Sequence, residues 1–173
     1  SGSARLDLPD ATGINPVYGD GFPNGRLAGD ETFEWPHAPA ADGGTVDLRE
    51  VPPREATIHD QSYFVDLAEG WYAVTNPDLD LGFALRFPLD PFECLWYWQA
   101  FGGYHESPWF NRNYNAGLEP TTAYPGGNLP EAQRENGTMK VLDPGETVTA
   151  EFTAVTYGGR EAVSGVSADG TVS

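Results

Sequence analysis

The chain has 173 residues, 39% of them hydrophobic, which fits one globular domain rather than a disordered segment. Its 26 acidic residues against 9 basic ones give a net charge of −17 at pH 7. Because phosphate binding needs a basic face, this charge argues against nucleic acid or an anionic membrane as partner. Surplus carboxylates with a single lysine, Lys140, favour a halophilic source over an ordinary acidic protein.

Neither a membrane span nor a metal site is expected. No apolar stretch has the length of a span, and the first residues lack the hydrophobic region of a secretory signal. We therefore expect a soluble, cytoplasmic protein. Cys94 is the one cysteine, and the three histidines, His37, His59 and His105, lack metal-ligand spacing. We expect no metal and no cofactor.

In chain order, the predicted elements begin late. Residues 1–12 are interpreted as a leader or cloning remnant, and residues 10–56, rich in Gly, Pro and Asp, as a long loop region. β-Branched and aromatic residues between turn residues then predict strands over 57–67, 70–75, 79–87, 93–101, 137–142 and 147–157. Since Gly and Pro leave little room for long helices, the class is all-β.

The last predicted strand shows the clearest alternation. Val148, Phe152 and Ala154 fall on a mostly apolar face, and residues such as Glu151 and Tyr157 fall on a mostly polar one. Residues 159–173, which are poor in large apolar side chains, are expected to form a flexible tail.

The strand predicted over residues 93–101 carries aromatic rings between hydrogen-bonding groups, as a carbohydrate site requires. Alternation separates Trp96 and Trp98 from Tyr97 and Gln99, so one of the two pairs faces the site. The pattern does not decide between Trp98 and Gln99.

Glu119 is the candidate general base. It lies two residues after Gly117 and directly before Pro120, which favours an extended backbone at a strand end or loop mouth. The alternative is a carboxylate that simply faces solvent. Arg112 suits a carboxylate or a pair of sugar hydroxyls, or serves as a surface counter-charge, and His59 suits a general acid or a structural role.

Several segments together resemble the aldose 1-epimerase (galactose mutarotase-like) family. The matching segments are, in chain order, residues 13–22, 95–99, 117–122, 128–132 and 142–146. The resemblance implies an antiparallel β-sandwich over residues 13–158, equivalent to the C-terminal part of the family fold. It also implies that α and β anomers of a free aldose are interconverted without a cofactor.

The resemblance assigns residue roles as well. Glu119 is the base, and the acid histidine of the family falls on Asn15, whose amide can hydrogen-bond a ring oxygen but cannot transfer a proton. Trp98, Gln99, His59 and Arg112 are the remaining candidates for contact with the sugar. The resemblance further implies that this chain lacks the family's N-terminal half, and we then expect a homodimer or pairing with that half to close the exposed edges.

Three functions are therefore weighed. The first is an aldose 1-epimerase-like isomerase of reduced activity, with a small aldose as its partner. The second is a non-catalytic carbohydrate-binding β-sandwich, and the third is an inactive fragment of the family.

Overall fold

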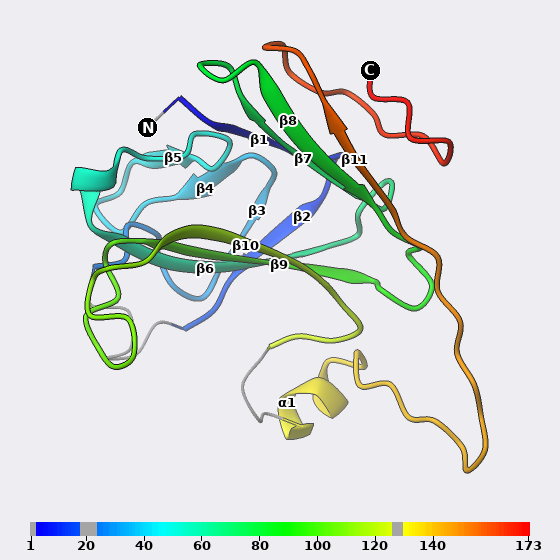
Figure 1. Ribbon diagram of the computed structural model, residues 1–173. Coiled ribbons are helices and arrows are strands. Elements are labelled where there is room, and N and C mark those ends of the chain that lie inside the picture. Colours follow the sequence, from blue (N-terminus) through cyan, green and yellow to red (C-terminus); the bar gives the residue numbers. More distant parts are fainter. Residues whose placement is uncertain (1–2, 18–23, 126–129) are drawn as a thin grey trace.

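The computed structural model describes residues 3–17, 24–125 and 130–173. Two antiparallel sheets pack face to face, and a short helix lies to one side of them (Figure 1). The predicted all-β class and the antiparallel sandwich are confirmed. Residues 18–22 and 128–129, which belong to segments carrying the resemblance, lie outside the described residues, as do residues 1–2 of the expected leader.

The five-stranded sheet has the strand order β10-β9-β6-β2-β3. In that order its strands are Tyr114–Thr121, Cys94–Phe101, Ile58–Val65, Thr12–Asn15 and Glu31–Glu34. The four-stranded sheet has the order β1-β7-β8-β11, with strands Arg5–Asp7, Trp71–Asn76, Leu81–Arg86 and Thr153–Tyr157. A hairpin of β4 (His37–Pro39) and β5 (Thr45–Asp47), the 3-10 turn Arg54–Ala56 and α1 (Pro130–Glu135) complete the fold.

The main core fills the space between the two sheets. Alternate residues of the five-stranded sheet, including Phe33, Phe64 and Leu95, meet Leu6 and Tyr72 from the four-stranded sheet. The opposite face of the five-stranded sheet, which we call the outer face, points away from this core. Alternation along each strand therefore decides whether a side chain belongs to the core or to the outer face.

The first part of the chain is more ordered than predicted. The expected leader supplies β1, which pairs with β7 and buries Leu6, and the expected loop region supplies β2, β3, β4 and β5. These strands are only three or four residues long. β1 and β2 also pair with strands far away in the sequence, β7 and β6, so local composition did not reveal them.

The end of the chain differs from the prediction too. Residues 137–142 form no strand, and only Thr153–Tyr157 of the last predicted strand is regular. Its faces are also exchanged. Val155 and Tyr157, from the side predicted to be polar, pack against Val163 and Val166, whereas Ala154 is exposed.

In place of a flexible tail, residues 159–173 cover the outer side of the four-stranded sheet. Val163 and Val166 are buried there against Trp71 and Ala84. The backbone N–H of Val163 donates to Asp7 Oδ2 at 3.0 Å. Two valines and one buried hydrogen bond thus anchor a segment that composition alone described as loose.

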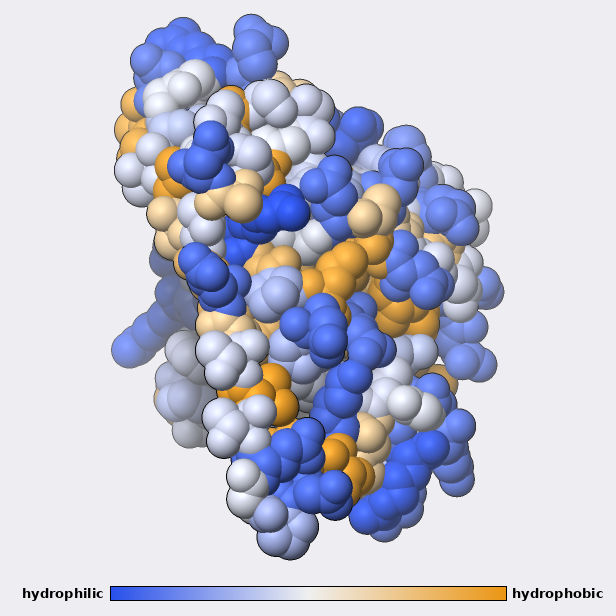
Figure 2. Space-filling model, turned by 90° about the vertical axis from the view of Figure 1, so that its right-hand side faces the viewer, coloured by the Kyte–Doolittle hydropathy of each residue, from blue (hydrophilic) through white to orange (hydrophobic). Residues whose placement is uncertain are grey.

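The four-stranded sheet exposes apolar side chains near its edge strand β11. Leu81 and Phe83, in β8, are 51% and 40% exposed, and Val148 and Phe152 before β11 are also exposed. Figure 2 shows the side of the molecule on which β11 lies, with apolar residues in orange gathered near its middle.

Candidate functional site

The outer face carries Glu119 together with two tryptophans. In the strand register, Glu119 is the Cα partner of Trp96, and Gly117 is the partner of Trp98. On the other side of β9, Trp98 is paired with Gln61 and Trp96 with Tyr63. Since directly paired residues point to the same side of a sheet, all of these side chains share one face.

The Glu119 side chain is exposed and lies back over Gly117. A Cβ atom at Gly117 would be only 2.8 Å from Glu119 Oε1 and 3.4 Å from Trp98 Cβ. Any side chain at this position would therefore displace the carboxylate. The glycine leaves the space in which the Glu119 carboxylate lies beside the indole of Trp98.

His59 lies on the same face and is linked to Trp98. The indole Nε1–H of Trp98 donates to His59 Nε2 at 3.0 Å, and the imidazole forms a T-shaped pair with the Tyr104 ring at 4.4 Å between centroids. His59 is only 2% exposed. Because Nε2 accepts this hydrogen bond, it carries no proton, and His59 is neutral in this arrangement.

Aromatic rings continue along the outer face on both sides of Glu119. Trp109 packs on Trp98 with 5.6 Å between centroids. Tyr63 packs on Trp96 at 5.6 Å and on Tyr124 at 5.7 Å. The indole N–H of Trp96 also donates to the backbone oxygen of Ala123 at 2.9 Å, which fixes the segment after β10 above the sheet.

Asn15 and Gln99 lie on the opposite, inner side of the same sheet, which corrects the expectation that they meet a substrate beside Glu119. Asn15 donates to the backbone oxygen of Ala28 at 3.0 Å and accepts from the Ser62 hydroxyl at 2.8 Å. Both side chains are buried, at 1% exposure. The amide of Asn15 therefore has a structural role. Of Trp98 and Gln99, it is Trp98 that lies on the outer face with Glu119.

Gln99 belongs to a buried ionic network. Arg26 donates from Nε to Asp60 Oδ2 at 2.9 Å and from Nη2 to Gln99 Oε1 at 2.6 Å. The backbone N–H of Arg26 donates to the other Asp60 oxygen at 2.8 Å. Asp60 is completely buried, so this network neutralises a carboxylate inside the sandwich.

Arg112 is not brought to Glu119. It lies exposed in the loop between β9 and β10, where its backbone N–H donates to the oxygen of Trp109 at 2.9 Å. Glu119 is five residues beyond Tyr114, the first residue of β10, or about 17 Å along the strand. The outer-face site is therefore built without Arg112.

Sequence reasoning missed Gln61 and Tyr63 as members of this face. The strand that contains them, β6, was predicted, but its pairing with β9, which carries Trp96 and Trp98, was not. A usable signal was the alternation through Ile58–Val65, which places His59, Gln61 and Tyr63 on one side.

Two features are absent from the described residues, a metal-ligand cluster and a membrane-spanning helix. Within residues 3–17, 24–125 and 130–173, no three His, Cys, Asp or Glu side chains are grouped so that they could hold a metal ion. No helix in this described part of the chain is long and apolar enough to cross a membrane.

Comparison with known proteins gives one match. No curated protein and no solved structure matches the chain significantly. A family model described as "Domain of unknown function (DUF4432)" matches residues 29–155, which include β6, β9 and β10 with His59, Trp98 and Glu119. Because the match spans well over half of the chain, the protein belongs to this family.

Proposed function

We propose that the protein is an aldose 1-epimerase-like isomerase that interconverts the α and β anomers of a free aldose at the outer face. One observation carries the proposal: the Glu119 carboxylate lies over Gly117 and beside Trp98. A carboxylate next to an indole ring suits a pyranose, whose apolar face packs on the ring while its hydroxyls meet the acid.

In the proposed reaction Glu119 removes the proton from the anomeric hydroxyl. The C1–O1 bond becomes a carbonyl, the bond between C1 and the ring oxygen breaks, and the ring oxygen takes up a proton from water. The C1–C2 bond then rotates, the ring oxygen attacks the other face of the carbonyl and returns its proton to the hydroxide left by that water, and Glu119 returns its own proton to O1. Gln61, whose Cα is paired with that of Trp98, lies on the same face, and its amide Nε2 donates to the backbone oxygen of Ser62 at 3.3 Å.

This arrangement predicts reduced activity. His59 Nε2 accepts the hydrogen bond from the indole N–H of Trp98, so this nitrogen has no proton to donate as an acid. An enzyme that lacks its general acid is slower by about 10²–10⁴-fold. The proposed mutarotase therefore works mainly through its base and its aromatic platform.

The decisive experiment is polarimetric mutarotation of freshly dissolved glucose and galactose. The Glu119→Gln variant keeps the size of the side chain and removes the base, so we expect its rate to fall to the uncatalysed rate. Glu131→Gln, the same change on the exposed helix α1, is the control and should keep the wild-type rate. Equal rates for the wild type and Glu119→Gln would contradict the proposal.

A non-catalytic sugar-binding module is the second candidate, favoured by the hydrogen bond that occupies His59 Nε2. Titration of the tryptophan fluorescence with the same sugars separates the two candidates. Saturable quenching without any acceleration of mutarotation would establish binding alone.

We also propose that the protein works in a salt-rich cytoplasm, because its net charge is −17. Salt screens repulsion among surface carboxylates, so the thermal unfolding midpoint should rise between 0.1 M and about 2 M KCl. Calorimetry in both salts measures this, and a falling midpoint would contradict the assignment.

A further inference from the structure

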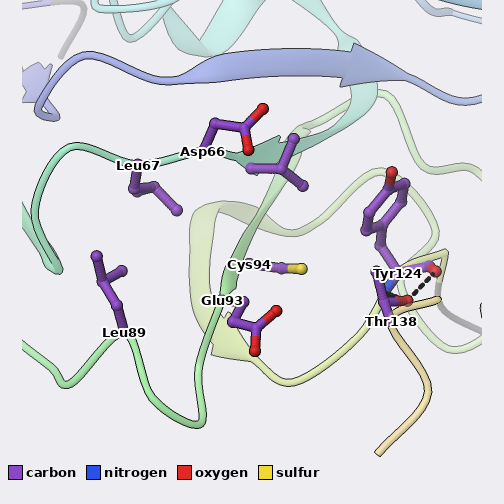
Figure 3. A pocket seen from close by; sticks show the side chains of 8 residues that line it. Asp66, Leu67, Leu89, Glu93, Cys94, Tyr124 and Thr138 are labelled. Atoms are coloured by element: carbon purple, nitrogen blue, oxygen red, sulfur yellow. Dashed lines mark hydrogen bonds between the residues drawn. The ribbon is translucent and has the colours of Figure 1, made fainter. Parts of the chain in front are cut away.

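A cavity of about 400 Å³ opens at the end of the aromatic row on the outer face (Figure 3). Its lining residues are Val65, Asp66, Leu67, Leu89, Glu93, Cys94, Tyr124 and Thr138. Figure 3 shows the Cys94 thiol and the Glu93 carboxylate on the side that faces Tyr124 and Thr138.

The cavity continues the face that carries Glu119. Val65 and Cys94 are the next residues on this side of the sheet after Tyr63 and Trp96. Cys94 is the Cα partner of Thr121, which is two residues beyond Glu119 and thus about 7 Å further along β10. That separation is comparable to the length of one sugar unit.

Tyr124 forms the aromatic wall and is held firmly. Its backbone oxygen accepts from Asn136 Nδ2 at 2.8 Å and from the Thr138 hydroxyl at 3.1 Å. Its ring packs on Tyr63, which in turn packs on Trp96. Tyr124 thus lines the cavity and also packs on the aromatic rings of the outer face, so it links the two sites.

The lining selects against anions. Asp66 and Glu93 add two carboxylates, and the one lysine nearby, Lys140, is paired with Glu93. Burial is the main cause, and the negative charge of Glu93 the second, of a pKa raised to about 11 at Cys94, so its thiol is neutral at pH 7. An apolar floor, one aromatic wall and carboxylate acceptors suit a neutral group that is rich in hydroxyls.

We infer that this cavity is a subsite for a second, neutral sugar unit, so that the substrate is a disaccharide or a longer chain with its reducing end at Glu119. The inference rests on the proposed function. It names the substrate class: oligosaccharides that carry neither phosphate nor carboxylate on the second unit.

The test compares binding of glucose with that of maltose, cellobiose and lactose, by calorimetry on the full chain. Each of these disaccharides ends in a reducing glucose. We expect at least one to bind about fivefold to tenfold more tightly than glucose, which is the range of one added aromatic contact.

Two variants examine the cavity. Tyr124→Ala should remove the disaccharide gain. Asp66→Asn should reduce the gain while preserving the backbone, because Asp66 has a φ of 51° and Asn tolerates that region well. Phe152→Ala, at an exposed aromatic residue before β11, is the matched control and should keep the gain.

The outcomes separate this inference from the proposed function. Normal glucose binding and mutarotation with no disaccharide gain, or a gain that survives both cavity variants, would overturn the subsite alone. Absence of binding and of mutarotation with every sugar would overturn both. A gain lost in Tyr124→Ala supports the subsite even where mutarotation is slow.

Discussion

The two faces of the five-stranded sheet use neighbouring residues for opposite purposes. Asp60 follows His59 in β6, and Gln99 follows Trp98 in β9, yet one member of each pair is locked in the buried network of Arg26 and the other faces outward. The inner polar groups are hydrogen-bonded to one another, whereas Glu119 on the outer face is exposed. Alternation thus separates the buried, hydrogen-bonded polar groups of the inner side from the exposed carboxylate of the outer face.

The largest effect should come from breaking the inner network. Arg26→Leu leaves Asp60 as a buried carboxylate without its ion pair, so the free energy of unfolding should fall by ~3–5 kcal/mol. Urea unfolding measures the loss. Arg112→Leu, at an exposed arginine in a loop, is the control, and its free energy of unfolding should stay close to that of the wild type. Equal stabilities of the two variants would contradict the structural role of the inner network.

Cys94 tests the floor of the cavity. Its pKa is raised to about 11 from an ordinary value of 9, so at pH 7.5 the thiolate fraction is about a hundredfold lower than in the unfolded chain. Iodoacetamide should therefore react about a hundredfold faster in urea than under native conditions. As pH rises from 9 to 11 the unfolded chain ionises this thiol first, so stability should fall in that window. A native rate equal to the unfolded rate would show that the thiol is open to solvent.

Asn15→Ala should lower the free energy of unfolding and leave the rate of mutarotation unchanged. The change leaves the Ser62 hydroxyl without its buried acceptor, and we expect a loss of ~1–3 kcal/mol. Mutarotation per folded molecule should remain at the wild-type value, because Asn15 lies on the inner side. A lower mutarotation rate with an unchanged free energy of unfolding would instead indicate that Asn15 contacts the substrate.

Gly117→Ala should have the smallest effect and the most local one. The added methyl group displaces the Glu119 carboxylate from its place beside Trp98. The mutarotation rate measured by polarimetry should therefore fall about tenfold, because catalysis is sensitive to misplacement of a reacting group. Ala116→Gly, at the exposed preceding residue, is the control for a change in the same strand. If Gly117→Ala kept the full mutarotation rate, the position of the Glu119 carboxylate over Gly117 would not support the proposed function.

Four central strands could be predicted from the sequence because they are long and rich in aromatic or β-branched residues. They are β6, β7, β8 and β9. β10 escaped prediction because Gly117 and Pro120 interrupt its pattern, and a sheet accepts such residues most readily at its edge. Residues 137–142 have strand-like composition but form no strand in the structure.

Less of the site than of the fold could be foreseen. Alternation correctly separated Trp98 from Gln99, but only the pairing of β10 with β9 shows that Trp98 shares the face of Glu119. Asn15 was placed by resemblance of a local segment, and its hydrogen bonds to Ala28 and Ser62 depend on how distant strands meet. Pairing across long sequence separations sets these contacts, and composition does not encode it locally.

The position of β10 at the rim of its sheet has a consequence for solubility. Edge strands attract other chains through their unpaired backbone groups, and prolines and charged residues at an edge counter this tendency. Pro120 brings no N–H to that rim, and the neighbouring Glu119 adds a charge. The residues that present the carboxylate thus also discourage aggregation through the same strand.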